Sequence, residues 1–550
     1  MTGIDIIGDI MKLITVKNAF IDKITTKITS HRIICGLLAT FFSLPSFADP
    51  PADVLKIIPS SNLVSLDPIW TTANVTRNHG YMIYDTLFGT DIDGNIKPQM
   101  VESWKVSDDN LTWTFVLRDG LKFSDGTPVT SDDVIPSLQR WSTRDSFGSA
   151  LASFVERYQA VDAKTFTLTL KEPFGMMLEA LGKPSSNVPF IMPKAVAQTS
   201  GDVQIRSTLG SGPYMFKTDE FKSGERVVYV KNPYYVPRDE PPSGTTGGKK
   251  VYIDRVEWLI IRDPQTQFNA LINGEADILE QPAFEQIPAL GKTPNINLVK
   301  AQPIGMLQII RFNFLQPPFN DARIRRAAML ALGEQQMLRV QIGVPELQKF
   351  CKSMYPCGTT FASDETGEFT GVANPQKAKA LLQEAGYQGQ PVVLMRPTDS
   401  PTIAKLPLVA KQQLEQAGFK VDLQNMDWQT LVARRAKKDA PSAGGWNAFM
   451  TAWAAEDVLN PLTMAMMNAR GEKGWFGWQD DPELEALKAR FARTVDKGEK
   501  KKIATQIQLR AFETVTHVPL GQYELRAAVR SNVTGLVSSG AQVYWNIRKQ

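Results

Sequence analysis

The sequence PQMVESWKVSDDNLTWTFVLRDGLKFSDGTPVTSDDVIPSLQRW, residues 98–141, says more about the fold than any other part of the chain. Within it, Trp113 and Phe115 alternate with threonines, which predicts a half-buried β-strand. An Asp-Gly turn follows at 125–126, and Thr130 with acidic residues directly after it predicts the start of a helix. We therefore expect a strand hairpin followed by a helix.

As a string of residues, this stretch resembles the signature of periplasmic solute-binding proteins of the peptide/nickel class, the receptors that feed ABC importers. Other stretches resemble elements of the same family in the same order: YDTLF at 84–88, GSGPYMF at 210–216, ALINGEADI at 270–278 and QPPFNDARIRR at 316–326. The resemblance implies an α/β chain with the two-lobed periplasmic-binding-protein type II fold. It also implies an extra subdomain in lobe I, a two-strand hinge, and a ligand enclosed between the lobes.

Local patterns predict further elements of an α/β chain. They indicate a strand-helix-strand unit at 251–279, which favours parallel strands, and one long helix from about 316 to 342. A helix followed by a strand occurs twice more, at 375–395 and 408–423. With the resemblance, these patterns predict a signal peptide at 1–48, lobe I at 49–300 with an inserted subdomain at about 91–208, lobe II at 301–516, and a return to lobe I at 517–550.

The N-terminus has the features of a secretory signal peptide. Five lysines and arginines precede an apolar run at 33–44, and small residues at 46–48 suit a cleavage site. The run is shorter than the roughly 20 residues that span a bilayer. The basic region is long enough that translation could begin at Met11. Cleavage after Ala48 would deliver the protein to the periplasm, where a receptor without a lipid-attachment cysteine would diffuse freely.

Two cysteines remain after this cleavage. Cys351 and Cys357 lie in a short loop that contains proline and glycine. In an oxidising compartment, such a pair predicts a disulfide. A metal-binding or redox pair is the alternative, but the spacing is not Cys-x-x-Cys and no second ligand pair accompanies it.

Composition argues against several functions. Lys and Arg number 61 against 57 Asp and Glu, so neither nucleic acid nor an anionic membrane is expected as the main partner. Short basic clusters such as Arg434-Arg435 are interpreted as solvated helix faces. Outside the signal peptide, His79 and His517 are the histidines of the chain, which gives little support to a histidine-based nickel site. No hydrolase motif is present, so we predict neither catalysis nor a cofactor.

The best candidate for a ligand site is GWNAFMTAWAAEDVLNP at 445–461. An apolar strand ends in Trp453, and Glu456 and Asp457 follow it. In peptide-binding members of the resembled family, an Asp three residues after this Trp holds the α-amino group of the peptide. Here that position is Glu456, with Asp457 beside it, so either carboxylate is a candidate to pair with a cation. A solvated acidic loop before a helix is the alternative.

Two other stretches supply candidate ligand contacts. Asn74 and Arg77 lie in a polar segment before an apolar helix, where Arg77 could receive a ligand carboxylate or could pair with a structural Asp. Trp475 lies in the aromatic loop GWFGW at 474–478, which could line a pocket or cover a flat ligand such as haem, or could be pinned by the core.

We therefore expect an extracytoplasmic solute-binding receptor that captures a peptide or similar small metabolite between two lobes. It would deliver this ligand to the permease subunits of an ABC importer in the inner membrane, and it is expected to act as a monomer that closes about a hinge. A haem, opine or metal-chelate receptor on the same fold is the alternative within the binding class. A secreted hydrolase is the alternative from another class.

Overall fold

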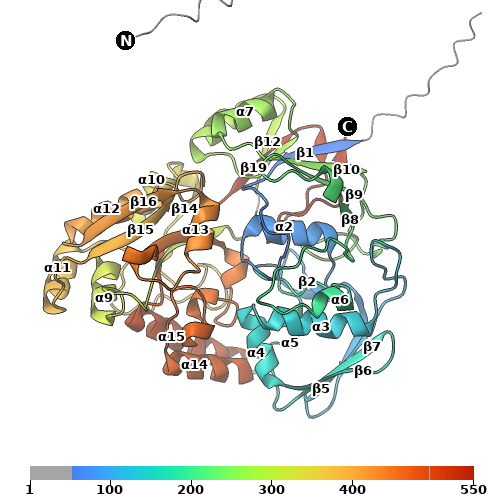
Figure 1. Cartoon of the computed structure of the whole chain (residues 1–550), viewed down its shortest axis with the longest axis horizontal. Helices are drawn as coiled ribbons and strands as arrows, with labels where there is room; N and C mark the ends of the chain where they lie inside the picture. The colour runs from blue at the N-terminus through green and yellow to red at the C-terminus, as the bar shows by residue number, and fades with distance from the viewer. Residues whose placement is uncertain (1–52, 301, 495) are drawn as a thin grey trace, which may run out of the picture. The chain divides into compact units, whose positions relative to one another are not determined.

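A computed structural model describes residues 53–300, 302–494 and 496–550. The predicted signal peptide at 1–48 and the alternative start at Met11 lie outside these described residues. Across the described ranges, no helix has both the length and the apolar character that crossing a membrane requires. Most of the chain is arranged around three β-sheets with helices packed on them (Figure 1).

A seven-stranded sheet brings together both ends of the described chain. Its strand order is β12 (Ile296–Lys300), β19 (Arg526–Arg530), β11 (Ile278–Leu279), β1 (Val54–Ile58), β10 (Arg255–Leu259), β9 (Arg226–Lys231) and β8 (Tyr214–Phe216). The predicted strand-helix-strand unit is confirmed as β10, α7 (Pro264–Ile272) and β11. Both strands are parallel to β1, which lies between them.

The stretch at 98–141 forms the predicted hairpin and helix. The antiparallel sheet here has the order β4 (Val101–Val106), β5 (Thr112–Leu117), β7 (Thr165–Leu170), β6 (Val155–Ala160). Phe115 of β5 is fully buried and stacks on Phe166 of β7 with ring centroids 5.0 Å apart. The helix α3 (Ser131–Ser142) begins as predicted, because the Thr130 N–H donates to Asp133 Oδ2 at 2.9 Å in a capping box.

A six-stranded sheet organises the second half of the chain. Its order is β14 (Gln348–Lys349), β18 (Val518–Tyr523), β13 (Met306–Phe312), β17 (Ala448–Ala454), β15 (Pro391–Pro397) and β16 (Lys420–Met426). The strand β15 is parallel to both β16 and β17. Its surrounding helices are α9 (Ala322–Ala331), α10 (Glu334–Gln341), α11 (Pro375–Glu384), α12 (Leu406–Gln416), α13 (Trp428–Arg434), α14 (Pro482–Arg493) and α15 (Lys497–Thr514) (Figure 1).

Shorter elements complete the described chain. The helices among them are α2 (Asn74–Ile83), α4 (Ser146–Phe154), α5 (Met177–Leu181), α6 (Lys194–Ala197) and α8 (Ile287–Leu290). The short strands are β2 (Phe88–Thr90), β3 (Ile96–Pro98), β20 (Val533–Thr534) and β21 (Arg548–Lys549). Single 3₁₀ turns are η1 (Thr218–Glu220), η2 (Phe284–Gln286), η3 (Pro345–Leu347), η4 (Pro441–Ala443), η5 (Ala455–Val458), η6 (Ala465–Met467) and η7 (Gly471–Lys473).

The prediction of one long helix from about 316 to 342 is wrong. This segment contains two helices, α9 and α10, which are separated by Leu332 in an extended conformation and by Gly333. A Cβ atom at Gly333 would lie 2.7 Å from the backbone nitrogen of Ala373, so glycine permits the close approach of a distant segment at the break. The chain therefore turns where the local apolar pattern continues.

The described chain passes between the seven-stranded and the six-stranded sheet twice, between β12 and β13 and between β18 and β19. The first change lies close to residue 301, where the sequence predicts the start of lobe II. The second comes between Tyr523 and Arg526, because β18 still pairs with β13 in the six-stranded sheet. This change is later than residue 517, where the sequence places the return to lobe I. The division into lobes and subdomain itself remains a prediction.

A disulfide and a buried network of hydrogen bonds stabilise the two halves of the chain. Cys351 and Cys357 form the predicted disulfide. In the other half of the chain, the buried carboxylate of Asp85 accepts hydrogen bonds from Lys249 Nζ at 2.7 Å, the Tyr235 hydroxyl at 2.8 Å and Gln99 Nε2 at 3.2 Å. Burial alone would raise the pKa of Asp85, but Lys249 and the other donors hold it below its usual value.

Candidate functional site

Two adjoining cavities lie between segments from the first half of the described chain, up to residue 281, and segments from residue 306 onward. We call them the polar cavity, of about 330 Å³, and the aromatic cavity, of about 930 Å³. Both volumes fall in the range of small-molecule sites in proteins. The two cavities are continuous in their lining, since they share Val64, Thr72, Ala73, Gln429 and Arg435.

The polar cavity is built at the carboxyl ends of parallel strands. From the seven-stranded sheet, residues 59–62 follow β1 and residues 260–262 follow β10. From the six-stranded sheet, residues 399–403 follow β15 and residues 427–429 follow β16. Ligands of open α/β sheets bind outside the carboxyl ends of parallel strands, where loops diverge and leave a crevice. Each sheet therefore contributes its ordinary ligand-binding edge to the same cavity.

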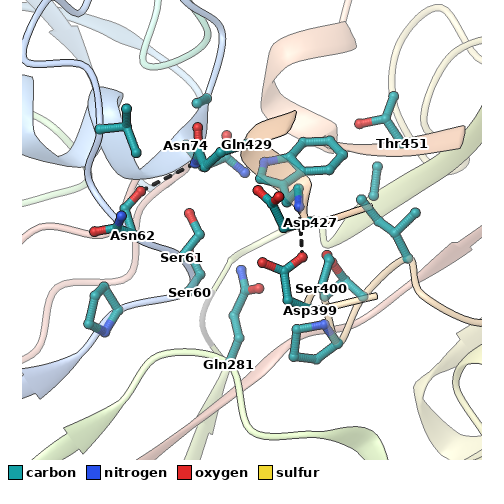
Figure 2. Close-up of a pocket in the computed structure, with 18 of the residues that line it drawn as sticks. Ser60, Ser61, Asn62, Asn74, Gln281, Asp399, Ser400, Asp427, Gln429 and Thr451 are labelled. Carbon is teal, nitrogen blue, oxygen red and sulfur yellow. Dashed lines mark hydrogen bonds between the residues drawn. The ribbon is translucent and has the colours of Figure 1, made fainter. Parts of the chain in front are cut away.

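Side chains from the two sheets face one another across the polar cavity (Figure 2). Asn62 comes from the loop after β1, and Asp399 and Gln429 come from the loops after β15 and β16. Gln429 Nε2 donates to the Asn62 carbonyl oxygen at 3.3 Å, and the Trp428 N–H donates to Asp399 Oδ1 at 2.7 Å. The hydrogen bond between Trp428 and Asp399 thus fixes one wall of the cavity within a single lobe. The hydrogen bond between Gln429 and Asn62 connects the two lobes.

Four of the six predicted ligand-binding residues line these cavities. Asn74, Trp453 and Asp457 line the polar cavity, and Trp475 lines the aromatic cavity. The rings of Trp453 and Trp475 meet at 5.5 Å between centroids. The structure therefore places a tryptophan from β17 and a tryptophan from the aromatic loop on one continuous surface.

Arg77 and Glu456 line neither cavity. Arg77 donates to Asn78 Oδ1 and to the Ser185 hydroxyl in the lobe that contains α2. Glu456 accepts a hydrogen bond from the Ile304 N–H at 3.2 Å and packs against Gly540. Because Ile304 lies between β12 and β13, Glu456 contacts a segment that joins the two sheets.

Asp457 is a buried carboxylate at the edge of the polar cavity. It is 2% exposed and accepts the Ser186 N–H at 2.9 Å, a hydrogen bond that joins the two lobes. No lysine or arginine among the described residues forms an ion pair with it. Burial raises its pKa, and the charge of Arg77 partly opposes this shift. Asp457 is therefore a buried carboxyl group without an ion pair, which is the kind of group that can bind a cation.

Sequence reasoning missed Arg435, as it also missed Asn62, Asp399 and Gln429 of the polar cavity. The pair Arg434-Arg435 was expected on a solvated face, and this is wrong for Arg435, which is 3% exposed and lines both cavities. It follows α13, whose position is set by the N-cap Asp427 directly after β16. Burial lowers the pKa of Arg435 to about 10. The sequence signal that could have indicated Arg435 is the position of its helix, which directly follows a parallel strand.

A pH dependence of stability follows from Glu456. Burial raises the pKa of Glu456 to about 7, against 4.5 for an exposed glutamate, and Oε2 has no hydrogen-bond partner. As pH rises from 4.5 to 7, the unfolded chain releases a proton that the folded chain keeps, so the free energy of unfolding falls. We expect Glu456→Gln to remove this fall and to be more stable than the native protein by up to about 3 kcal/mol at pH 8.

Urea unfolding at pH 5 and pH 8 measures this difference. Glu346→Gln, at an exposed position, is the control and should change neither value. An equal effect of Glu456→Gln at both pH values would contradict the prediction.

Metal-binding side chains do not gather in the described ranges, where no group of three or more His, Cys, Asp or Glu residues could hold a metal ion.

Comparison with known proteins identifies the family of the chain. Residues 95–475 match the family described as bacterial extracellular solute-binding proteins, family 5 Middle. The chain is 38% identical over 491 residues to a probable peptide ABC transporter periplasmic-binding protein of Sinorhizobium fredii, covering 89% of this chain and 92% of that protein. It is 27% identical over 529 residues to a glutathione-binding protein of Salmonella typhi, covering 93% and 96%.

A solved structure supports the fold. The dipeptide-binding protein from Pseudoalteromonas sp. SM9913, in complex with Met-Leu, superimposes with a TM-score of 0.75 at 19% identity, covering 90% of this chain and all of that one. The two-lobed fold expected from the sequence is thereby confirmed.

Proposed function

Because the chain belongs to family 5 of the bacterial extracellular solute-binding proteins, which are receptors and not enzymes, we propose that it captures short peptides in its polar and aromatic cavities. The observation that carries the proposal is Asp457, a buried carboxylate without an ion pair on the wall of a cavity between two lobes. A peptide ammonium group supplies the missing partner. The relative named for peptide transport and the relative named for glutathione are consistent with this ligand class.

The proposed ligand contacts follow from the lining of the two cavities. Asp457 binds the α-amino group, Asn74 offers a side-chain amide nearby, and Trp453 and Trp475 form apolar walls for the peptide side chains. Arg77 and Glu456 support the surrounding segments instead of touching the ligand. The resembled family has an Asp at the position that Glu456 occupies here. In this assignment Asp457, one residue later, takes the role of that Asp.

Binding shifts the population of lobe arrangements toward the closed form. The described hydrogen bonds between lobes near the cavities include Gln429 with Asn62, Asp457 with Ser186, and Arg435 with Thr72. A ligand that touches both lobes adds contacts that exist only when the lobes are close, so it favours closure by its differential affinity. The closed receptor, a periplasmic monomer in this proposal, then engages the permease of its ABC importer.

The proposal is tested by calorimetric titration of the ligand-free mature protein with Ala-X-Ala tripeptides that carry any of the twenty residues at X. We expect binding with one site per chain, and we expect N-acetylation of a bound tripeptide to abolish it, because the acetylated nitrogen carries no charge for Asp457. Binding of acetylated and free tripeptides with equal affinity would contradict the assignment of Asp457. Absence of binding across the panel would contradict the peptide function.

A further inference from the structure

Arg435 differs from the other buried arginines of the described chain in its hydrogen bonding. Each of the others donates to at least two backbone or side-chain oxygens; these are Arg77, Arg118, Arg140, Arg311 and Arg325. Arg435 has one hydrogen bond, from Nη2 to the Thr72 hydroxyl at 3.4 Å, which is long, and its Nε has no partner. Burying a guanidinium with so few hydrogen-bond acceptors costs free energy unless another group supplies the missing acceptors.

Aromatic rings surround the guanidinium without satisfying it. Its central carbon lies 4.8 Å from the ring centroid of Phe476, and at 5.8–6.0 Å from those of Phe449, Trp475 and Trp428. Ring faces attract a cation, which helps to retain the charge in a buried position. They offer no hydrogen-bond acceptor in the plane of the guanidinium. The rings therefore contact the guanidinium but accept no hydrogen bond from its N–H groups.

No carboxylate of the described protein neutralises this charge. The acids that line the aromatic cavity are engaged elsewhere, Asp145 by Lys183 and Glu472 by Lys438 at 2.9 Å. Further cations line the same cavity, among them Arg144, which stacks on Trp70 at 4.7 Å. At the junction of the two cavities, the guanidinium of Arg435 therefore has no ion-pair partner among the described residues.

We propose that Arg435 is the receptor for a carboxylate of the ligand, and that the ligands are consequently peptides, or peptide-like conjugates of amino acids, with a free carboxyl group. A planar carboxylate accepts two parallel hydrogen bonds from a guanidinium, which supplies the acceptors that Arg435 lacks. Arg435 and Asp457 both line the polar cavity, and both are buried without an ion pair, so the cavity offers a buried charged group of each sign to a zwitterion. This inference rests on the proposed function, because it names the second end of the proposed ligand.

The position of Arg435 also explains why a carboxylate would favour closure. Its one hydrogen bond reaches Thr72 in the other lobe, so the charge lies where the lobes meet. A carboxylate bound here fills the junction between the polar and aromatic cavities, which share both Thr72 and Arg435. Ligand size is then limited by the aromatic cavity beyond this junction, of about 930 Å³.

The test compares Ala-X-Ala tripeptides as free acids and as C-terminal amides on the native protein, Arg435→Gln and Arg435→Lys. We expect the native protein to bind a free acid about 100-fold more tightly than its amide, since the amide leaves the buried guanidinium unpaired. In Arg435→Gln this preference should disappear, through loss of affinity for the acid. Arg435→Lys should retain part of it, because lysine keeps the charge but not the two-pronged geometry.

An amidated tripeptide with glutamate at X separates the two sources of a carboxylate. If it binds like a free acid and loses affinity in Arg435→Gln, Arg435 takes a side-chain carboxylate; if it binds like the other amides, Arg435 takes the C-terminus. Lys437→Gln removes an exposed charge two residues further on and is the control for general electrostatics. Equal affinities for acids and amides in the native protein, or an unchanged preference in Arg435→Gln, would overturn the inference.

The thermal stability of the ligand-free variants gives a second, independent result. An arginine that serves a ligand leaves an uncompensated charge in the empty protein, so Arg435→Gln should melt at or above the temperature of the native protein. A clearly lower melting temperature would assign Arg435 a structural role and overturn the inference even if no tripeptide bound. Absence of binding by every acid and amide would instead contradict the proposed function, and the melting result would still decide on Arg435.

Discussion

Lys249→Met is expected to lower the free energy of unfolding by about 3–5 kcal/mol. Lys249 and Asp85 are both fully buried, and their ion pair at 2.7 Å is the one strong charge contact of the Asp85 carboxylate. Methionine has a similar volume, so little packing is lost. The loss comes from the carboxylate, which keeps neutral donors alone, namely the Tyr235 hydroxyl, Gln99 and the Thr86 N–H. Urea unfolding at pH 7 measures it.

Two further variants make this result specific. Lys250→Met, at the exposed neighbouring position, removes the same charge and should change the free energy of unfolding by less than about 0.5 kcal/mol. Asp85→Asn combined with Lys249→Met should be more stable than Lys249→Met alone, because no buried charge is then left unpaired. A double variant as unstable as the sum of both single variants would contradict this explanation.

Asp457→Asn is expected to weaken peptide binding by about 100-fold, because the ligand ammonium group would lose the one carboxylate that faces it in the buried part of the cavity. Asparagine keeps the size of the side chain and an oxygen that can accept the Ser186 N–H. The ligand-free variant should therefore fold normally. Since a buried lone carboxylate is also unfavourable, its melting temperature should equal or exceed that of the native protein.

Asp427→Asn is the matched control for this variant. Asp427 lines the same polar cavity but is exposed, and asparagine caps a helix as well as aspartate does, so α13 should remain in place. We expect at most a few-fold change in affinity. Calorimetric titration with the same tripeptide measures both variants. If Asp427→Asn had the larger effect, the ammonium site would lie at the β16 end of the cavity and not at Asp457.

Features that are local in sequence were predictable, and the residues show why. The alternation around Phe115 and the cap at Thr130 are written in adjacent residues, and both elements form as expected. Trp453 and Asp457 were found because an apolar strand that ends in an aromatic residue and acids is visible as a string. The break between α9 and α10 was not predictable in this way, because Gly333 is required by contact with Ala373, which lies in another segment.

Arg435 shows the same limit at the site. Arg434 is half-buried and donates to the carbonyl oxygens of Gly444 and Gly445, whereas Arg435 turns into the cavity between rings from three separate segments. Adjacent residues on a helix point in directions about 100° apart, so two identical neighbours have different environments. Only the assembled strands β16 and β17 and the aromatic loop reveal which arginine lines the cavities. Similarly, Glu456 and Asp457 could not be separated until the hydrogen bond to Ile304 was known.

Native mass spectrometry of the mature protein taken directly from the periplasm shows whether this receptor holds a peptide with both ends charged. The structure predicts a series of added masses that match short peptides, released on denaturation and bearing free amino and carboxyl groups. A single added mass that corresponds to a compound other than a peptide would contradict this proposal and would assign the cavities to a dedicated metabolite.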